Sequence, residues 1–179
     1  VPDSTRLKPF VALREYLTHS RGWKFEPSTK RLRELRDENR LKTTVIVRSE
    51  SDAQDRLSTN TEELVDALRK NFNIESHIFT NITKFMPLDE QMRMWHESDL
   101  VIGIHGAAMG FSFAMRPGSV LVTQCRGSKC KYWETNMGPL MGVQVEHVKY
   151  EHDNPSDSVQ TIVDFHVDDI VDSLRRHFA

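Results

Sequence analysis

Short apolar runs alternate with amphipathic stretches along most of the chain beyond residue 42. The runs are rich in β-branched residues and are bounded by polar or turn-forming segments, which is typical of buried strands. They predict five strands, at residues 43–47, 74–79, 100–104, 119–123 and 143–150. Apolar residues at helical spacing predict helices at 61–71, from Pro87 onward, at 107–115 and at 167–178.

Strands that alternate with helices and are apolar throughout favour a parallel sheet covered on both faces. With right-handed crossovers, this pattern predicts an α/β, Rossmann-like fold. The first part of the chain differs, because its two predicted helices, at 6–19 and 28–41, are rich in charge. We expect the second of them to lie on the surface or against a part of the protein outside this chain. The sequence therefore predicts an N-terminal helical arm (1–41) and a Rossmann-like lobe (42–179).

Composition narrows the classes of function. The 179 residues carry a formal net charge of -2, which argues against a general nucleic-acid partner. No stretch approaches the roughly 20 apolar residues of a membrane span, so none is expected. H-E-x-x-H, C-x-x-C and G-x-S-x-G are all missing from the sequence, which predicts neither a metal site nor a serine hydrolase.

Two features bear on the cellular compartment. Cys125 and Cys130 are close enough to close a small disulfide loop in an oxidising environment, and otherwise are two reduced thiols beside a strand end. Asn81 begins an Asn-x-Thr sequon for N-glycosylation, which has meaning only in the secretory pathway. Together they favour a lumenal or secreted protein.

The candidate chemistry lies where predicted strands end. The third strand runs into His105-Gly106-Ala107, where small residues and free amide hydrogens at a helix start would admit a phosphate and the imidazole would add a hydrogen bond. The alternative is a tight turn whose histidine bonds a backbone carbonyl. Arg48 follows the first strand, with Arg56 beyond it, and guanidinium groups suit phosphate. The alternative for them is two solvated surface arginines.

These residues belong to two blocks that resemble glycosyltransferase family 61. One block is Asp-Leu-Val-Ile-Gly-Ile-His-Gly-Ala-Ala-Met at 99–109, followed by Arg-Pro-Gly and an apolar strand at 116–122. The other is Val-Ile-Val-Arg at 45–48 with Arg56 and Asn60 downstream. The resemblance implies a two-lobed GT-B enzyme, with this chain as one lobe. It further implies that residues 42–179 are the nucleotide-sugar-binding lobe. The implied reaction is inverting transfer of a sugar such as GlcNAc or xylose from a UDP-sugar to a protein or glycan hydroxyl, in the ER or Golgi lumen. No cofactor is expected, because two cationic side chains can take the role of a metal cation.

By that resemblance, Arg48 and His105 contact the donor diphosphate, and the backbone of Gly106 and Ala107 donates hydrogen bonds to it. His105 is also the one candidate in this lobe for the catalytic base. The base is otherwise expected from an acceptor-binding lobe outside this chain.

Two further residues enter through the same resemblance. Arg56 and Asn60 would order the loop over the donor. Thr123 stands where the family has a glutamate suited to the donor ribose. That departure favours an alternative, a non-catalytic pseudoenzyme or protein-binding lobe that keeps the fold. A Rossmann-like enzyme for another nucleotide is a further alternative, disfavoured because G-x-G-x-x-G is missing from the sequence.

Overall fold

The computed structural model describes residues 8–25, 32–47, 58–79, 86–126, 138–150 and 163–179. In these residues five parallel strands form one sheet in the order β2-β1-β3-β4-β5. The strands are β1 (Thr43–Ile46), β2 (Ser76–Phe79), β3 (Leu100–Ile104), β4 (Val120–Arg126) and β5 (Gln144–Tyr150). The helices are α1 (Lys8–Arg21), α2 (Leu32–Asp37), α3 (Thr61–Phe72), α5 (Leu88–Glu97), the 3₁₀-helix η2 (Ala107–Ala114) and α7 (Val167–Phe178).

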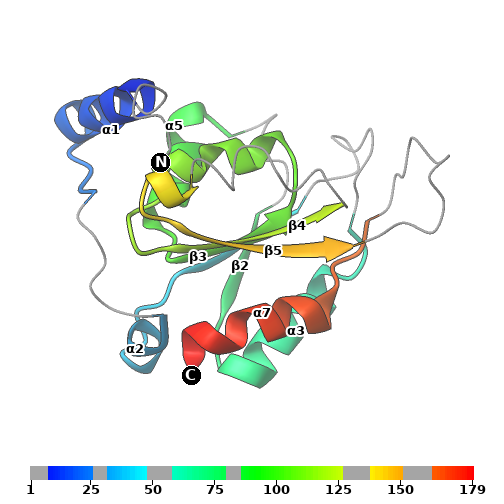
Figure 1. Ribbon diagram of the computed structural model, residues 1–179. Coiled ribbons are helices and arrows are strands. Elements are labelled where there is room, and N and C mark those ends of the chain that lie inside the picture. The colour runs from blue at the N-terminus through cyan, green and yellow to red at the C-terminus, as the bar shows by residue number, and fades with distance from the viewer. Residues whose placement is uncertain (1–7, 26–31, 48–57, 80–85, 127–137, 151–162) are drawn as a thin grey trace, which may run out of the picture.

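Helices cover both faces of the sheet, so the predicted Rossmann-like architecture is confirmed, and it is consistent with one lobe of a GT-B enzyme (Figure 1). Successive residues of each strand point to opposite faces. Val45 and Ile102 pack with α3 and α7, whereas Ile46 and Val101 pack with α5, η2 and α1. This two-sided burial explains why the central strands are apolar at every position rather than at every second one.

Three local predictions differ from the structure. The segment after β3 is a 3₁₀-helix instead of an α-helix. Asn60 does not cap α3 with its side chain, although its place before the helix, with Glu63 three residues later, predicts a capping box. β4 continues to Arg126, beyond the predicted end at Thr123, because β5 pairs with it along its whole length.

The N-terminal helices pack on the lobe itself. Leu32 and Leu35 of α2 are buried and α2 contacts α7, so α2 covers part of this chain rather than a part outside it. On the other face, Leu17 of α1 is buried in the core formed with α5 and η2. The division into an arm and a lobe at residue 41 stays a prediction, but both helices contribute to the cores of the sheet.

Arg14 of α1 joins the N-terminal part to the lobe through several hydrogen bonds. Its guanidinium donates hydrogen bonds to the carbonyls of Phe113 (2.9 Å), Met115 (2.7 Å) and Met141 (3.1 Å). The same group lies over the ring of Phe25, 4.8 Å from its centroid. Burial lowers the pKa of Arg14 to about 10. The contact therefore holds α1 against the end of η2 and the segment that leads to β5.

An aromatic cluster beside this contact contains a histidine. His96 of α5 stacks on Trp23 at 4.8 Å between centroids and meets Phe25 edge-on, also at 4.8 Å. Its Nδ1 lies 3.2 Å from the carbonyl of Ala114, which can only accept, so the neutral ring carries its proton there. Burial, assisted by Arg116 and Arg14, lowers the pKa of His96, although the bond to Ala114 opposes the shift.

The lowered pKa of His96 predicts acid sensitivity. The folded protein binds fewer protons than the unfolded chain around the ordinary histidine pKa of 6.5, so the unfolding free energy should fall as the pH drops below that value. Burial also lowers the pKa of His177 and acts with the same sign. Urea unfolding at pH 7.5 and 5.5 measures the loss. His96→Asn retains a donor for Ala114 without titrating, and should flatten the dependence. An equal slope in that variant would contradict the role given to His96.

Candidate functional site

The carboxyl ends of the central strands meet at one edge of the sheet. Ile46 of β1 is in register with Gly103 of β3, which is in register with Thr123 of β4. The next residue after β1, Val47, still donates its amide to the carbonyl of Phe79 of β2 (2.8 Å). Ligands of open α/β sheets bind at this edge, which is where the sequence predicts the site. The side chains predicted to come from the end of β1, those of Arg48 and Arg56, lie outside the described residues.

The His105 turn leaves β3 at this edge. The amide of His105 still bonds the carbonyl of Gln124 at 2.7 Å, so β3 and β4 remain paired up to the turn, and the histidine is half-buried. The first bond of η2 runs from the Met109 amide to the Gly106 carbonyl (3.0 Å). Gly106 and Ala107 come before Met109 in the chain. Amides at the start of a helix, before its first hydrogen-bonded amide, have no partner within their own helix. The turn therefore places a histidine next to the backbone donors at the start of a helix, the kind of position at which proteins bind phosphate.

A close packing contact holds η2 against the strand. A Cβ atom on Gly103 would lie 2.4 Å from Cε of Met109 and 3.3 Å from Cβ of Ile46. Met109 itself is 1% exposed. Because glycine leaves this space to Met109, η2 lies directly over the end of β3. The absence of a side chain at Gly103 therefore sets the position of the His105 turn at the end of β3.

Gln124 of β4 connects the His105 turn to the chain just before α7. Its side chain is fully buried, donates to the carbonyl of Asp164 (2.8 Å) and accepts from the amide of His166 (2.7 Å). Its own carbonyl accepts from the amide of His105. Sequence reasoning placed this residue at a strand end but gave it no role. A glutamine inside an apolar run was the available signal, because a buried amide needs partners.

Asn60 makes an equivalent contact with the same segment. Its side chain accepts from the amide of Phe165 (2.8 Å) and donates to that residue's carbonyl (2.9 Å). Asp164 in turn accepts from the amide and hydroxyl of Thr59 (2.9 and 2.8 Å). The structure thus shows Asn60 fixing residues 163–166 (Val163 to His166). Its predicted effect on the loop over the donor concerns residues that the structure does not describe.

Thr123 is enclosed in the sheet, because β4 continues three residues beyond it to Arg126. Its side chain is fully buried on the face covered by η2, in register with Gly103 on one side and His147 on the other. Its hydroxyl has no hydrogen-bond partner among the described residues. The predicted contact with a ribose stays a prediction, and it would require this hydroxyl to reach a ligand from a buried position.

The predicted covalent modifications concern residues that are only partly described. Cys125 is buried, its sulfur lies 3.8 Å from Nδ1 of His147, and it is not a free thiol. Cys130, its expected partner, and Asn81, the expected glycosylation site, lie outside the described residues. Disulfide pairing and glycosylation therefore stay predictions.

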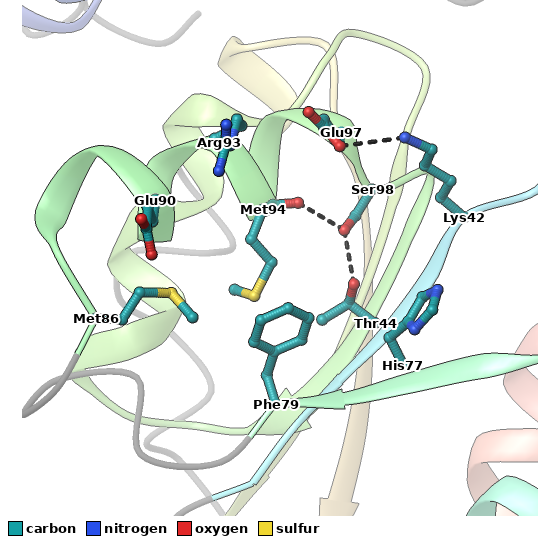
Figure 2. Close-up of a pocket in the computed structure, with 10 residues that line it drawn as sticks. All are labelled: Lys42, Thr44, His77, Phe79, Met86, Glu90, Arg93, Met94, Glu97 and Ser98. Carbon is teal, nitrogen blue, oxygen red and sulfur yellow. Dashed lines mark hydrogen bonds and ion pairs between the residues drawn. The ribbon is translucent and has the colours of Figure 1, made fainter.

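A separate cavity of about 590 Å³ lies beside β1, β2 and α5. It is lined by Lys42, Thr44, His77, Phe79, Met86, Glu90, Arg93, Met94, Glu97 and Ser98 (Figure 2). Hydrogen bonds from Thr44 to Ser98 and from Ser98 to the Met94 carbonyl, both 2.8 Å, close one wall, and Lys42 pairs with Glu97 above them. None of the predicted site residues lines this cavity. The side chains that line the cavity carry both positive and negative charges, so its lining does not favour one class of ligand.

The residues that the structure describes also bear on two other classes of site. In this part of the chain, no group of three or more His, Cys, Asp or Glu side chains is placed to hold a metal ion. No helix within the same residues is long and apolar enough to cross a membrane.

Comparison with solved structures returns proteins of low sequence identity. The flavodiiron core Flv1 from Synechocystis is 13% identical, with 78% of this chain and 35% of that chain covered and a TM-score of 0.43. A WrbA-like flavodoxin from Agrobacterium tumefaciens is 8% identical, with 76% and 93% covered and a TM-score of 0.33. This chain spans about a third of the length of the flavodiiron core. The search of curated proteins gives no match.

The comparison with family models gives a match over most of the chain. The Glycosyltransferase 61 model matches residues 6–122, about two thirds of the 179 residues. The match begins in the predicted N-terminal arm and includes α1, α2, the His105 turn and the start of β4. It includes every residue of the two sequence blocks described above. The matched model describes a family of glycosyltransferases. The chain therefore belongs to the glycosyltransferase 61 family.

Proposed function

We propose that this chain is the donor-binding lobe of an inverting glycosyltransferase that uses a UDP-sugar. The sugar would be one such as GlcNAc or xylose, and the acceptor a hydroxyl of a protein or glycan. The observation that carries the proposal is the His105 turn, where His105 and the first residues of η2 follow directly on β3 at the carboxyl edge of the sheet. The family match supports the reaction class.

The chemistry of the proposed reaction follows from where charge develops. In an inverting transfer the acceptor oxygen attacks the anomeric carbon while the bond to the diphosphate breaks, and negative charge grows on the leaving UDP. Hydrogen bonds from His105 and the amides of Gly106 and Ala107 would stabilise that charge without reorganisation. The acceptor proton would pass to a base. We assign that base to an acceptor-binding lobe, and retain His105 as the candidate within this chain.

The compartment is part of the same proposal. We infer that the enzyme acts in the ER or Golgi lumen or outside the cell. The cysteines Cys125 and Cys130 and the sequon at Asn81 support this inference. Mass spectrometry of the secreted protein, before and after glycosidase and reductant treatment, tests it. A reduced, unglycosylated protein would contradict it.

Removing the imidazole should weaken the donor complex. His105→Ala is expected to reduce UDP affinity by about tenfold or more, because a charge-assisted hydrogen bond contributes about 1.5–3 kcal/mol. Calorimetric titration with UDP, UDP-GlcNAc and UDP-xylose measures the change. His19→Ala, on an exposed part of α1, is the matched control and should bind as the unmodified protein does. If no titrant gives heat with the unmodified protein, the donor proposal fails.

The buried Thr123 supports a second candidate, a lobe that keeps the fold without catalysis. A threonine hydroxyl enclosed in the sheet cannot supply the carboxylate that the family has at this position. The two candidates differ in turnover. A transfer assay with radiolabelled UDP-sugars on the full-length protein separates them, since a non-catalytic lobe would give no labelled product even where UDP binds.

A further inference from the structure

Residues 163–166, named here the amide-held segment, are fixed by an unusual set of contacts. Four consecutive backbone groups, from the Asp164 carbonyl to the His166 amide, are bonded by the side-chain amides of Gln124 and Asn60. Each of these two side chains donates one bond and accepts one. The segment is therefore held by specific polar contacts in addition to apolar packing.

The side chains of the segment alternate between the core and the outside. Val163 and Phe165 are buried, at 6% and 3% exposure, and Phe165 belongs to the core beneath α3 and α7. Asp164 and His166 are exposed. An extended segment with this alternation presents one row of side chains outward. His166 is the member of that row with an aromatic, proton-carrying ring.

His166 and the His105 turn are bonded to the same residue. The Gln124 carbonyl accepts from the His105 amide at 2.7 Å, and the Gln124 side chain accepts from the His166 amide at 2.7 Å. Gln124 itself is fully buried in a central strand, so its position is set by the sheet. The distance between the two histidine backbones is therefore determined through one fixed residue.

The contacts of the His166 ring leave part of it open. The ring lies 5.4 Å from that of Tyr150 at the end of β5, and its Nδ1 is 3.5 Å from a carboxylate oxygen of Asp169. Its side chain nevertheless keeps 44% of its surface exposed. A ring fixed at its backbone and partly open at the carboxyl edge is suited to contact a ligand that lies over that edge.

We propose that the amide-held segment is a wall of the nucleotide site, that His166 contacts the bound nucleoside diphosphate, and that Gln124 is the positioning residue that fixes this wall relative to the His105 turn. The inference rests on the proposed function, because it names further residues of the same donor site. It gives His166 a binding role and gives Gln124 an indirect one.

The direct test is a UDP titration followed by NMR signals of the histidine imidazoles in the full chain, assigned with His105→Ala and His166→Ala. The His105 and His166 signals should both move and should give the same dissociation constant. Movement of His105 alone overturns the wall and leaves the donor proposal standing. If neither signal moves and calorimetry shows no heat, the donor proposal fails together with the inference.

A pair of variants tests the positioning role. His166→Ala removes the ring and keeps the amide that Gln124 accepts from, whereas His166→Pro removes both. The backbone φ of His166 is -78°, which proline adopts without strain. We expect His166→Pro to bind UDP at least about threefold more weakly than His166→Ala, because the segment loses a bond to Gln124.

A purely structural role has a different signature. It would lower the unfolding midpoint of His166→Pro in the absence of UDP and leave its UDP affinity equal to that of His166→Ala. That result would overturn the positioning role of Gln124. If His166→Pro does not fold, the NMR titration of the unmodified protein still decides whether His166 belongs to the site.

Discussion

Asp99→Ala should lower the free energy of unfolding by about 3 kcal/mol, because it removes one partner of a largely buried ion pair and leaves donors without acceptors. Asp99 begins the turn into β3, and its side chain is 6% exposed. Its carboxylate accepts from Arg116 (2.5 Å) and from the amide of Lys42 (3.0 Å). The backbone of the same residue bonds Lys42 and Val120. The residue thereby joins the amino ends of β1, β3 and β4.

Asp99→Asn is the matched control for this prediction. Burial raises the pKa of Asp99, while the Lys42 amide and Arg116 oppose the shift, so ionising this carboxyl carries a desolvation cost. An asparagine keeps an acceptor for these donors without that cost, and should lose less stability than the alanine variant. Urea unfolding at pH 7 measures both. Equal losses would show that the charge, and not the hydrogen bonding, determines the contribution of Asp99.

Arg14→Met should lower the free energy of unfolding by about 2–3 kcal/mol, since three partly buried carbonyls lose their shared donor while the apolar stem is kept. Arg14 and Met141, which this contact joins, are 127 positions apart in the sequence. The loss should also loosen α1 from the end of η2. Urea unfolding gives the energy, and hydrogen exchange of the α1 amides reports the loosening.

Arg14→Lys separates charge from geometry. A lysine keeps the positive charge but cannot direct donors to three carbonyls at once as the guanidinium does, so it should recover less than half of the loss. Arg21→Met is the control at an exposed position of the same helix, where an ion pair with Asp89 is open to solvent and contributes little. Faster exchange of α1 in the control as well would contradict the specific role of Arg14.

Much of the fold followed from local patterns. The five strands and their parallel arrangement were predicted because apolar runs such as Leu100–Ile104 are buried on both sides, and burial of this kind leaves a continuous signature in the sequence. The His105 turn was placed at a strand end for the same reason.

The contacts between distant segments did not follow from such patterns. Asn60 has the features of a helix cap, yet its side chain bonds Phe165, 105 positions away. Gln124 bonds His166, 42 positions away, and α2 packs on α7 although its charge suggested an exposed helix. Each depends on which segments the sheet order brings together, and pairing across such separations leaves no periodic trace in either segment.

The sequence by itself determined the class of fold and the family, and it predicted the edge of the sheet where a phosphate would bind. These depend on the burial of each element and on a short motif, both of which are local properties of the chain. The tertiary structure alone decided that Gln124 and Asn60 fix the segment carrying His166, and that Thr123 is enclosed in the sheet. A polar side chain takes its partners from whatever the fold places beside it, and only the packed strands and helices determine those neighbours.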